Sequence, residues 1–480
     1  MLATTYQNFT SRPGYTSLYE EVSGRELPVK GRFPDWLKGT LLRNGPARFE
    51  AGEQRVSHWF DGFAMLSRFS FDQGRVSYTN KFVQTPILAK ANQSGQLQHT
   101  IFSAEPAAPF RPNASNFAAR HLDNPNVNIQ KIGSRYLALG ETVPSAQVDP
   151  GSLETLGIYE FPDSVAGQTT TAHPLYDPSS GFLYNFTTHF SRVSSYNIYY
   201  IQPGAQHRTL LASLPVAEPA YMHSFSLTER YLVLAEYPFT VNPLRLLTSG
   251  KPFMENFEWK AAKGTRFILI DKQTGKLVGS YTTGAFFSFH HINAFEAGEN
   301  IYLDLTAYSG VTSLYDLKLD KLRGLCLEDS SRAVGEFRRY RLPMRGQSVD
   351  YEVVSDHFIE LPRLNPAQTT RSDYRFAYGI GSDGDSIQGL HNRLFKINVA
   401  SGQTEVWHEP DQFPGEPVFV AAPQAQTEDN GVILSVVLDG LSETSYLLVL
   451  DAASFEEIAR ASLPHHLPFG FHGEYFKELF

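Results

Sequence analysis

Short apolar runs rich in aromatic and β-branched residues recur from about residue 65 to residue 460, and turn residues separate them. In the segment Phe69–Tyr78, two such runs flank Asp72-Gln73-Gly74, which predicts a β-hairpin. The same form recurs at 267–281 and 394–407, and two more strands are expected at 432–438 and 446–450. Helical periodicity is scarce, and short helices are expected only at 34–38 and 245–257. The pattern therefore predicts an all-β protein.

Many short strands joined by short turns form a sandwich, a barrel or a propeller. A propeller blade takes roughly 40 to 50 residues, so seven blades need roughly 300 to 350. A chain of 480 residues leaves the remainder for insertions that cap one face. No linker rich in Gly, Ser or Pro interrupts the chain, so residues 1–480 are expected to form one domain.

Composition excludes several classes of protein. Apolar residues make up 42% and charged residues 19%, which supplies a core and argues against disorder. The formal net charge is −9 without a basic run, so a nucleic-acid partner is not expected. Cys326 is the sole cysteine, which excludes an internal disulfide and a cysteine-based zinc site. No signal peptide is seen at 1–19 and no apolar run reaches about 18 residues, so we expect a cytoplasmic protein, with contact to a membrane surface left open.

Four of the 15 histidines lie beside aromatic or small residues at the edges of strand-like runs. Their spacing fits no zinc finger, so a shared metal would require four strands that converge, as they do at a propeller axis. Four neutral imidazoles suit zinc, copper or iron; zinc would make a closed structural site, whereas iron(II) would keep positions open. The four are His173, His223, His290 and His472.

Three glutamates also stand in apolar settings: Glu141, Glu360 and Glu416. A metal-bound histidine needs a partner for its second ring nitrogen, and a carboxylate often fills that place. The alternative is that each glutamate is a strand-edge carboxylate bonded to the backbone. The residues alone leave both interpretations open.

Five motifs in this order resemble those of the carotenoid cleavage oxygenase family, and the resemblance covers nearly the whole chain. They are the P-x-W-L-x-G-x-L-x-R-N-G-P pattern at 34–46, His58–Gly62, Phe289–Glu296, Glu416–Val420 and Gly470–Gly473.

The resemblance implies a seven-bladed β-propeller with a dome of loops and short helices over one face. It implies one iron(II) per chain, held by His173, His223, His290 and His472, with Glu141, Glu360 and Glu416 accepting Nδ1–H from three of them. It also implies an enzyme that uses O2 to cleave a double bond of a polyene into two carbonyl products.

Details of the motifs indicate a branch of the family. The segments 58–65 and 221–234 resemble the retinal-forming members, so a carotenoid or apocarotenoid substrate and a retinal-type product are expected. Stilbene-cleaving members carry a lysine where this chain has Gly140, which argues against a stilbene. Val127 stands where many relatives have threonine, so a hydroxyl near the iron is missing. An isomerohydrolase that splits a retinoid ester and an inactive carotenoid-binding propeller remain alternatives.

Aromatic residues near the histidines either line a substrate tunnel or belong to the core. The tunnel candidates are Val127, Phe225, Phe286 and Phe289, with Phe287 beside them. Asp61 and Gly62 are expected to shape a turn, and Asn293 and Glu296 to brace a ligand histidine.

The stretch Pro238–Phe253 combines apolar residues, Leu246 and Leu247 among them, with Arg245 and Lys251. It is long enough to dip into a membrane interface and too short to span a bilayer. The alternative is a helix packed on the propeller. The sequence does not indicate an oligomeric state.

Overall fold

The computed structural model describes residues 9–97, 101–102, 124–325, 335–346, 348–382 and 391–480. Within these residues, seven antiparallel sheets of four to six strands carry most of the secondary structure. Each sheet is one blade of a β-propeller, as the sequence predicted. Cys326 lies outside the described residues.

The blades follow one another along the chain, with two exceptions. The first blade includes a strand from the C-terminal end of the chain, and the seventh blade includes a strand from the N-terminal end. The first blade contains β1 (Val22–Glu26), β3 (Gly39–Arg48), β6 (Phe63–Asp72), β7 (Arg75–Phe82) and β36 (Gly473–Phe476); the second β8 (Asn128–Ile132), β9 (Arg135–Leu139), β10 (Ser145–Val148) and β11 (Thr155–Tyr159); the third β12 (Thr169–Thr170), β13 (Leu175–Tyr176), β14 (Leu183–His189), β15 (Ser194–Ile201) and β16 (Thr209–Val216); the fourth β17 (Ser226–Leu227), β18 (Tyr231–Glu236), β21 (Thr265–Asp271) and β22 (Leu277–Thr283). The fifth contains β23 (His291–Ala297), β24 (Asn300–Tyr308), β25 (Gly335–Pro343) and β26 (Asp350–Ser355); the sixth β27 (Glu360–Arg363), β28 (Phe376–Gly381), β29 (Arg393–Asn398) and β30 (Thr404–Trp407); the seventh β2 (Val29–Gly31), β31 (Gln412–Pro414), β32 (Val418–Ala421), β33 (Gly431–Asp439), β34 (Thr444–Asp451) and β35 (Glu457–Ser462).

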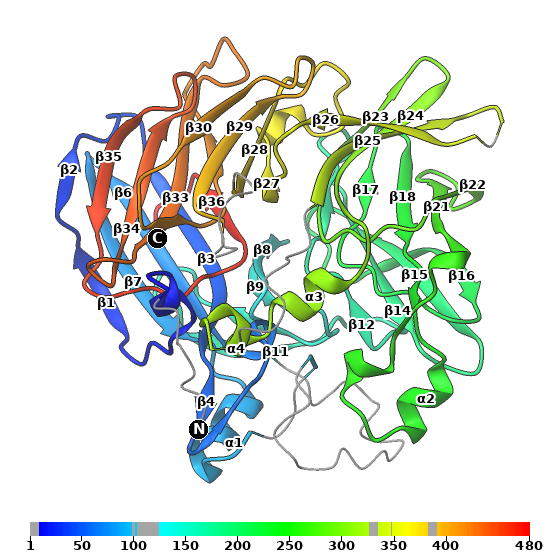
Figure 1. The fold of residues 1–480 in the computed structure, drawn as a ribbon, viewed down its shortest axis with the longest axis horizontal. Helices are drawn as coiled ribbons and strands as arrows, with labels where there is room; N and C mark the ends of the chain where they lie inside the picture. The colour runs from blue at the N-terminus through cyan, green and yellow to red at the C-terminus, as the bar shows by residue number, and fades with distance from the viewer. Residues whose placement is uncertain (1–8, 98–100, 103–123, 326–334, 347, 383–390) are drawn as a thin grey trace, which may run out of the picture.

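The two ends of the chain close the ring. The C-terminal strand β36 pairs with β3 of the first blade, with Thr40 opposite Phe476. The N-terminal strand β2 pairs with β35 of the seventh blade. In Figure 1 the sheets accordingly follow one another around a common centre, and blue and red strands meet where the circle closes.

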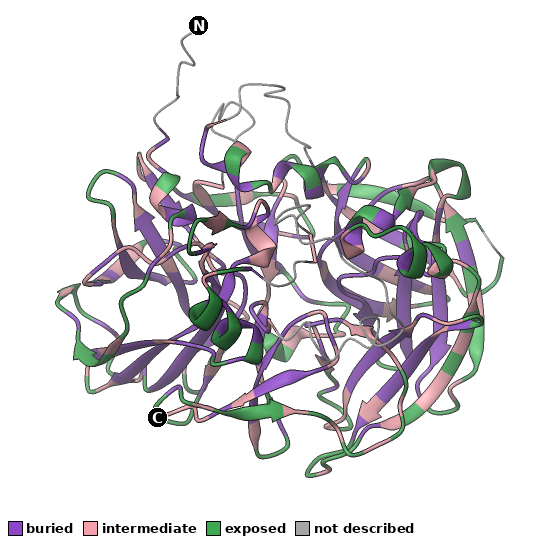
Figure 2. Ribbon diagram, turned by 90° about the horizontal axis from the view of Figure 1, so that it is seen from below, coloured by how far each residue is buried: buried purple, intermediate pink, exposed green. Residues whose placement is uncertain are grey.

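Seven clusters of buried apolar side chains each join two neighbouring blades, and together they complete the circle. Between the first and seventh blades, for example, Phe69 and Phe71 pack in one cluster with Leu434 and Leu447. Strands in the middle of a blade are therefore apolar on both faces, while the outermost strands β11, β22 and β26 are largely exposed. Figure 2 shows this change from buried inner strands to exposed edges.

An eighth cluster holds short helices and loops over one face of the propeller. It packs α1 (Pro86–Ser94), α4 (Leu319–Leu322) and the 3₁₀ turn η1 (Arg12–Tyr15) around Phe49 and Phe63. A hairpin of two short strands, β4 (Glu50–Ala51) and β5 (Gln54–Arg55), also belongs to this dome. The dome that the resemblance implied is therefore present.

The predicted hairpins are confirmed as β6–β7, β21–β22 and β29–β30, and the two further predicted strands are confirmed as β33 and β34. The predicted helix at 34–38 is wrong. Only one turn forms there, closed by the Leu37 N–H donating to the Pro34 carbonyl at 2.9 Å, because β3 begins at Gly39. Only seven residues separate β2 from β3, and so short a segment gains little from helix formation by itself.

The predicted helix at 245–257 is two short elements, α2 (Pro243–Thr248) and the 3₁₀ turn η3 (Phe253–Asn256). Gly250, with φ of +68°, and Pro252 interrupt the helix between them. A short sheet of β19 (Phe239–Thr240) and β20 (Glu258–Trp259) encloses this insertion, and the 3₁₀ turn η4 (Ala261–Lys263) follows it.

The expected membrane-facing stretch is only partly exposed. Leu244 is 63% exposed and Leu247 is 40% exposed, but Leu246 is buried, as are Phe239 and Val241. Phe239, Val241 and Leu246 pack in the core between the fourth and fifth blades, and Phe253 packs against it. None of the helices in the described part of the chain has the length and hydrophobicity that a membrane crossing requires.

Candidate metal centre

The four predicted histidines occupy equivalent places in four blades. His290 directly precedes β23, His472 directly precedes β36, and His223 lies three residues before β17. His173 lies between β12 and β13 of the third blade. Because all four residues lie at the inner strands of their blades, the propeller brings the four rings together.

The ring nitrogens of the cluster lie at the separations expected for ligands of one ion. The Nε2 atoms of His173 and His223 are 3.0 Å apart, and those of His290 and His472 are 3.2 Å apart. All four ligand atoms lie within 4.8 Å of one another. Two nitrogens bound at about 2.1 Å to one ion, at right angles, lie about 3.0 Å apart, so the spacing fits a shared metal.

Three glutamates fix three of the rings. Each accepts a hydrogen bond from an Nδ1–H, which turns the unprotonated Nε2 toward the cluster. The pairs and their N–O distances are His223–Glu141 at 2.6 Å, His290–Glu360 at 2.5 Å and His472–Glu416 at 2.8 Å. Among the described residues, no carboxylate contacts His173, whose backbone N–H donates to Thr171 Oγ1.

Two buried tyrosines orient two of these glutamates. Tyr221 Oη donates to Glu141 at 2.9 Å, and Tyr308 Oη donates to Glu360 Oε1 at 2.7 Å. Burial, and then the adjacent carboxylate, raises the pKa of both phenols well above its ordinary value, so both remain donors. Burial alone would raise the pKa of Glu360, but the interactions with His290, Tyr308 and the Leu361 amide outweigh it and lower the pKa.

The third glutamate, Glu416, has two arginines beside it in place of a tyrosine. Glu416 is fully buried and accepts a hydrogen bond from the Gly473 N–H at 2.8 Å. Arg43 and Arg363 each approach one of its carboxylate oxygens at 3.7 Å. Arg43 also donates to the carbonyls of Glu416 and Phe471, so it connects the carboxylate to the segment that carries His472.

The donor set suits a transition metal. Burial, followed by repulsion from the neighbouring rings, lowers the pKa of His173 and His472 well below the ordinary histidine value, which keeps these imidazoles neutral. Four neutral nitrogens with carboxylate partners outside them match zinc, copper or iron. The cluster therefore has the chemistry and the geometry of a metal centre.

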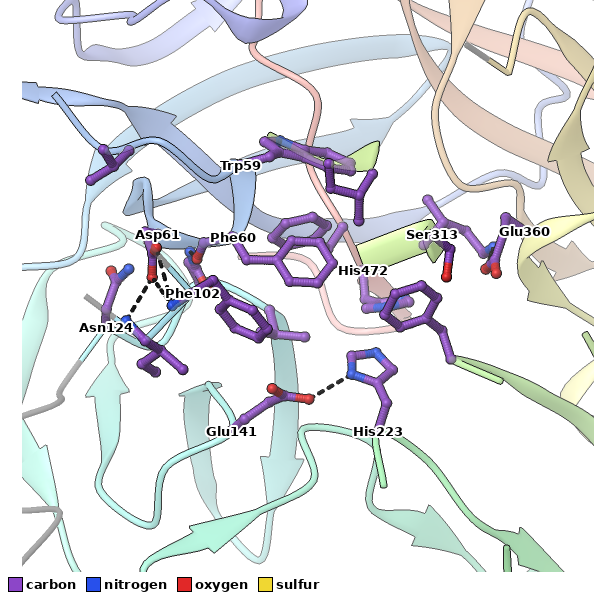
Figure 3. A pocket seen from close by; sticks show the side chains of 18 of the residues that line it. Trp59, Phe60, Asp61, Phe102, Asn124, Glu141, His223, Ser313, Glu360 and His472 are labelled. Carbon is purple, nitrogen blue, oxygen red and sulfur yellow. Dashed lines mark hydrogen bonds and ion pairs between the residues drawn. The ribbon is translucent and has the colours of Figure 1, made fainter. Parts of the chain in front are cut away.

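An apolar pocket opens onto this cluster. It encloses about 1230 Å³ of empty space, its open mouth included, and three of the histidines line it: His223, His290 and His472. Figure 3 shows Trp59, Phe60 and Phe102 gathered above Glu141 and His223. The apolar side chains of the lining include Trp59, Phe60, Phe63, Ile87, Leu97, Phe102, Val127, Phe289, Leu317 and Phe471.

Two of the four tunnel candidates line this pocket, namely Val127 and Phe289. The predictions for Phe225 and Phe286 are wrong. Phe225 packs edge-on against Phe186 in the core between the third and fourth blades, and Phe286 stacks on Tyr340.

Phe287 also belongs to the core, where its ring stacks on Tyr221. Successive residues of an extended segment point to opposite sides, so only some of the aromatics around 286–289 can face the pocket.

The aromatics that sequence reasoning missed include Phe60, Phe102 and Phe471. Phe60 lies inside the motif His58–Gly62, and Phe471 lies inside Gly470–Gly473, so the motifs already contained this signal. No sequence motif signalled Phe102, because a tertiary contact between two loops positions it in the pocket. Asp61 Oδ1 accepts hydrogen bonds from the N–H groups of Ile101, at 2.9 Å, and Phe102, at 3.2 Å.

The structural role expected of Asp61 and Gly62 agrees with these contacts. A Cβ atom on Gly62 would meet the Phe49 ring at 2.6 Å, so the turn requires glycine.

The bracing role predicted for Asn293 and Glu296 is wrong. Asn293 contacts the 368–371 segment, and Glu296 accepts hydrogen bonds from Thr228 Oγ1 and the Arg230 N–H. Both side chains therefore bind neighbouring loops and not a histidine of the cluster.

A seven-bladed propeller with four histidines at its axis and three glutamates behind them defines a class of metalloprotein. The chain belongs to the family described as retinal pigment epithelial membrane protein, whose sequence profile matches residues 15–477. The family resemblance seen in the motifs is thereby confirmed.

Relatives of known name support the same assignment. The carotenoid-cleaving dioxygenase, mitochondrial, of Mustela putorius furo is 33% identical over 525 residues, which cover 96% of each chain. The Homo sapiens protein of the same name is 32% identical and covers 96% of this chain and 90% of its own.

Solved structures share the fold over the whole chain. A variant of the Synechocystis apocarotenoid oxygenase superposes with a TM-score of 0.87 at 26% identity, covering 99% of this chain and all of the other. The cobalt-substituted Synechocystis enzyme gives a TM-score of 0.87 at 28% identity, with the same coverage.

Proposed function

We propose that the protein is an iron(II)-dependent dioxygenase that cleaves one C=C bond of a carotenoid or apocarotenoid. One O2 supplies one oxygen atom to each carbon of the broken bond, so two aldehydes form; the C=C bond is oxidised, O2 is reduced, and no added reductant is needed. The observation that carries the proposal is the four-histidine cluster at the inner wall of a large apolar pocket. The names of the relatives support it.

The residues that would hold iron are His173, His223, His290 and His472. Iron(II) with four imidazole ligands keeps coordination positions free, and it supplies the activation of O2 toward the double bond. The glutamates keep the Nε2 atoms unprotonated and aimed inward. The aromatic lining excludes water and binds the polyene by apolar contact.

The product class follows from the branch that the motifs resemble. The segments 58–65 and 221–234 support a substrate cleaved to retinal-type aldehydes. A stilbene is disfavoured at Gly140, where a Cβ atom would meet the Asn124 carbonyl oxygen at 3.0 Å and the Pro125 Cα at 3.3 Å. These close contacts leave little room for a side chain at position 140, where stilbene-cleaving members carry the lysine that holds a phenol.

Two other functions use the same pocket. An isomerohydrolase would use the metal as a Lewis acid and split a retinoid ester. An inactive carotenoid-binding propeller would need neither the histidines nor their glutamates, and the intact hydrogen bonds between them argue against it.

Product analysis tests the proposal. The protein is loaded with iron(II) and incubated aerobically with β-carotene and with a β-apocarotenal in detergent, and products are separated and weighed by mass spectrometry. Two aldehydes from one substrate, lost in His290→Ala, are expected, and their masses identify the cleaved bond. If iron binds and neither polyene is cut, the carotenoid-cleaving assignment fails, and a retinyl ester and a stilbene are assayed next. If no iron binds, the carotenoid-binding alternative replaces it.

Contact with a membrane surface suits a substrate that is nearly insoluble in water. The exposed side chains Leu244 and Leu247 on α2, with Arg245 and Lys251 beside them, support such contact. The mammalian relatives are named mitochondrial. The cytoplasmic location that the sequence suggested stays a prediction.

A further inference from the structure

We propose that the Ser313 hydroxyl is a polar anchor in the pocket, and that it selects polyenes carrying an aldehyde or alcohol over hydrocarbon polyenes. The inference rests on the proposed function and adds to it a specificity-determining residue and a narrower substrate class, the oxygenated apocarotenoids.

The Ser313 hydroxyl has no hydrogen-bond partner within the described residues. Its side chain lines the pocket, yet the residue is only 7% exposed, so water cannot compensate freely for the missing bond. A buried unpaired hydroxyl costs free energy, and native structures contain few of them. A ligand atom in the pocket would remove that cost.

Other polar side chains of the pocket are already used by the protein. Asn126 Nδ2 donates to the carbonyls of Phe60 and Gly62, at 2.8 and 2.7 Å. The Tyr308 hydroxyl donates a hydrogen bond to Glu360, and Asp61 accepts hydrogen bonds from the backbone N–H groups of Ile101 and Phe102. Ser313 differs from these groups because its hydroxyl is left for a bound molecule.

Hydrogen bonds from the His58–Gly62 motif fix the helix that carries Ser313. This helix is α3 (Thr312–Asp316). His58 Nε2 donates to the Leu314 carbonyl at 2.9 Å, because its Nδ1 accepts the Phe60 N–H and the proton must reside on Nε2. Burial lowers the pKa of His58 to about 4, so the ring is neutral and keeps this tautomer. The Trp59 N–H donates to the Leu317 carbonyl at 3.1 Å.

A hydroxyl on a segment held in this way is pre-organised, so little ordering is needed when a ligand binds it. The Ser313 hydroxyl also lies at one side of the pocket, away from much of its apolar lining. Figure 3 shows Ser313 near Glu360, on the opposite side of the pocket from Asp61 and Asn124. Phe63 and Ile87, which also line the pocket, pack in the dome cluster around α1.

A polyene that crosses the pocket would therefore meet apolar side chains along its length and one hydroxyl at the Ser313 side. A serine hydroxyl both donates and accepts, so it would bind an aldehyde oxygen as donor and an alcohol in either role. A hydrocarbon would leave the hydroxyl unpaired. Sites that hydrogen-bond a substrate group discriminate against analogues lacking it for this reason.

The test measures binding separately from catalysis. Trp59 lines the pocket, so quenching of tryptophan fluorescence reports polyene binding to the metal-free protein. We expect Ser313→Ala to raise the Kd of a β-apocarotenal about fivefold, the loss of one hydrogen bond, and to leave the Kd of β-carotene unchanged within about twofold. The KM of the iron-loaded variant should rise for the aldehyde by a similar factor.

Ser442→Ala, at an exposed turn, is the matched control and should leave both dissociation constants unchanged. The Ser313→Ala protein should unfold at a temperature no lower than the wild type, because it loses an unpaired hydroxyl. Equal binding of both polyenes to Ser313→Ala and wild type, or equal weakening of both, overturns the inference. Failure of the proposed function would be seen differently, as iron-loaded wild type that cleaves neither polyene.

Discussion

The Nδ1 atom of His223 and the Oε1 atom of Glu141 lie 2.6 Å apart, although the two residues are 82 positions apart in the sequence. Tyr221 Oη contacts the same carboxylate at 2.9 Å, so the ring, the carboxylate and the phenol form one chain of hydrogen bonds. The contact joins segments of the second and fourth blades, which are not neighbours in the ring. The geometry of the metal centre therefore depends on the closed ring of blades and not on one local segment.

Glu141→Gln should weaken metal binding about 10- to 100-fold, the range for loss of a partner behind a ligand histidine. The amide keeps the size of the side chain but loses its charge, and its NH2 competes with the Tyr221 phenol as a donor. Metal titration of the purified apoprotein measures the effect. Glu296→Gln is the control, because the hydrogen bonds of Glu296 within the described residues go to Thr228 Oγ1 and the Arg230 N–H and not to the histidine cluster. Equal metal affinity of the two variants would show that Glu141 does not support the ligand.

Tyr308→Phe removes the phenol that donates to Glu360 at 2.7 Å in a buried setting. We expect the free energy of unfolding to fall by about 1 kcal/mol or somewhat more, because the acceptor is a carboxylate. Metal affinity should fall only a few-fold, since the bond between His290 and Glu360 persists. Chemical denaturation of the apoprotein measures the stability. Tyr315→Phe, at a residue 51% exposed, is the control, and equal losses in both variants would contradict the assignment.

Asp177 and Lys272 form a buried ion pair at 2.9 Å that connects turns of the third and fourth blades. Burial alone would raise the pKa of Asp177, but hydrogen bonds from Lys272, Ser179 and Ser180 lower it to about 2. The folded-state pKa lies below the unfolded value near 3.9, so this carboxylate stabilises the fold fully above about pH 4. The contribution, about 2 kcal/mol, should be lost as the pH falls from about 4 to 2.

Denaturant unfolding at several pH values checks this expectation. The double variant Asp177→Asn, Lys272→Met removes both charges and avoids leaving a buried unpaired lysine. Its stability should depend less steeply on pH between about 4 and 2 than that of the wild type. Identical pH slopes would show that Asp177 does not titrate with the low pKa.

Much of the fold and of the histidine cluster could be predicted because strand patterns and short motifs are local. The segment Phe69–Tyr78 contains its own turn, and the motifs around His290 and His472 contain the residues that meet at the axis. The orientation of side chains between blades could not be predicted in the same way. Phe286 and Phe289 look alike in sequence, yet one packs in the core and the other lines the pocket.

The remaining misses have the same cause. Phe102 enters the pocket because its backbone binds Asp61, a contact across 41 positions that no local pattern signals. Leu246 and Leu247 are adjacent and equally apolar, but the packing of α2 buries the first and exposes the second. Tertiary contacts of this kind decide which side of a short helix faces the protein.

The exposed face of α2 gives the last prediction. Replacing Leu244 and Leu247 by Ser should reduce binding to liposomes about tenfold, because each exposed leucine would bury apolar area in the interface. Iron content should not change, since neither side chain contacts the metal cluster. Liposome sedimentation measures the binding. The control replaces Leu277 and Leu441, which are 54% and 72% exposed, by Ser and should leave liposome binding intact. Equal binding by both double variants would locate the membrane contact elsewhere on the surface.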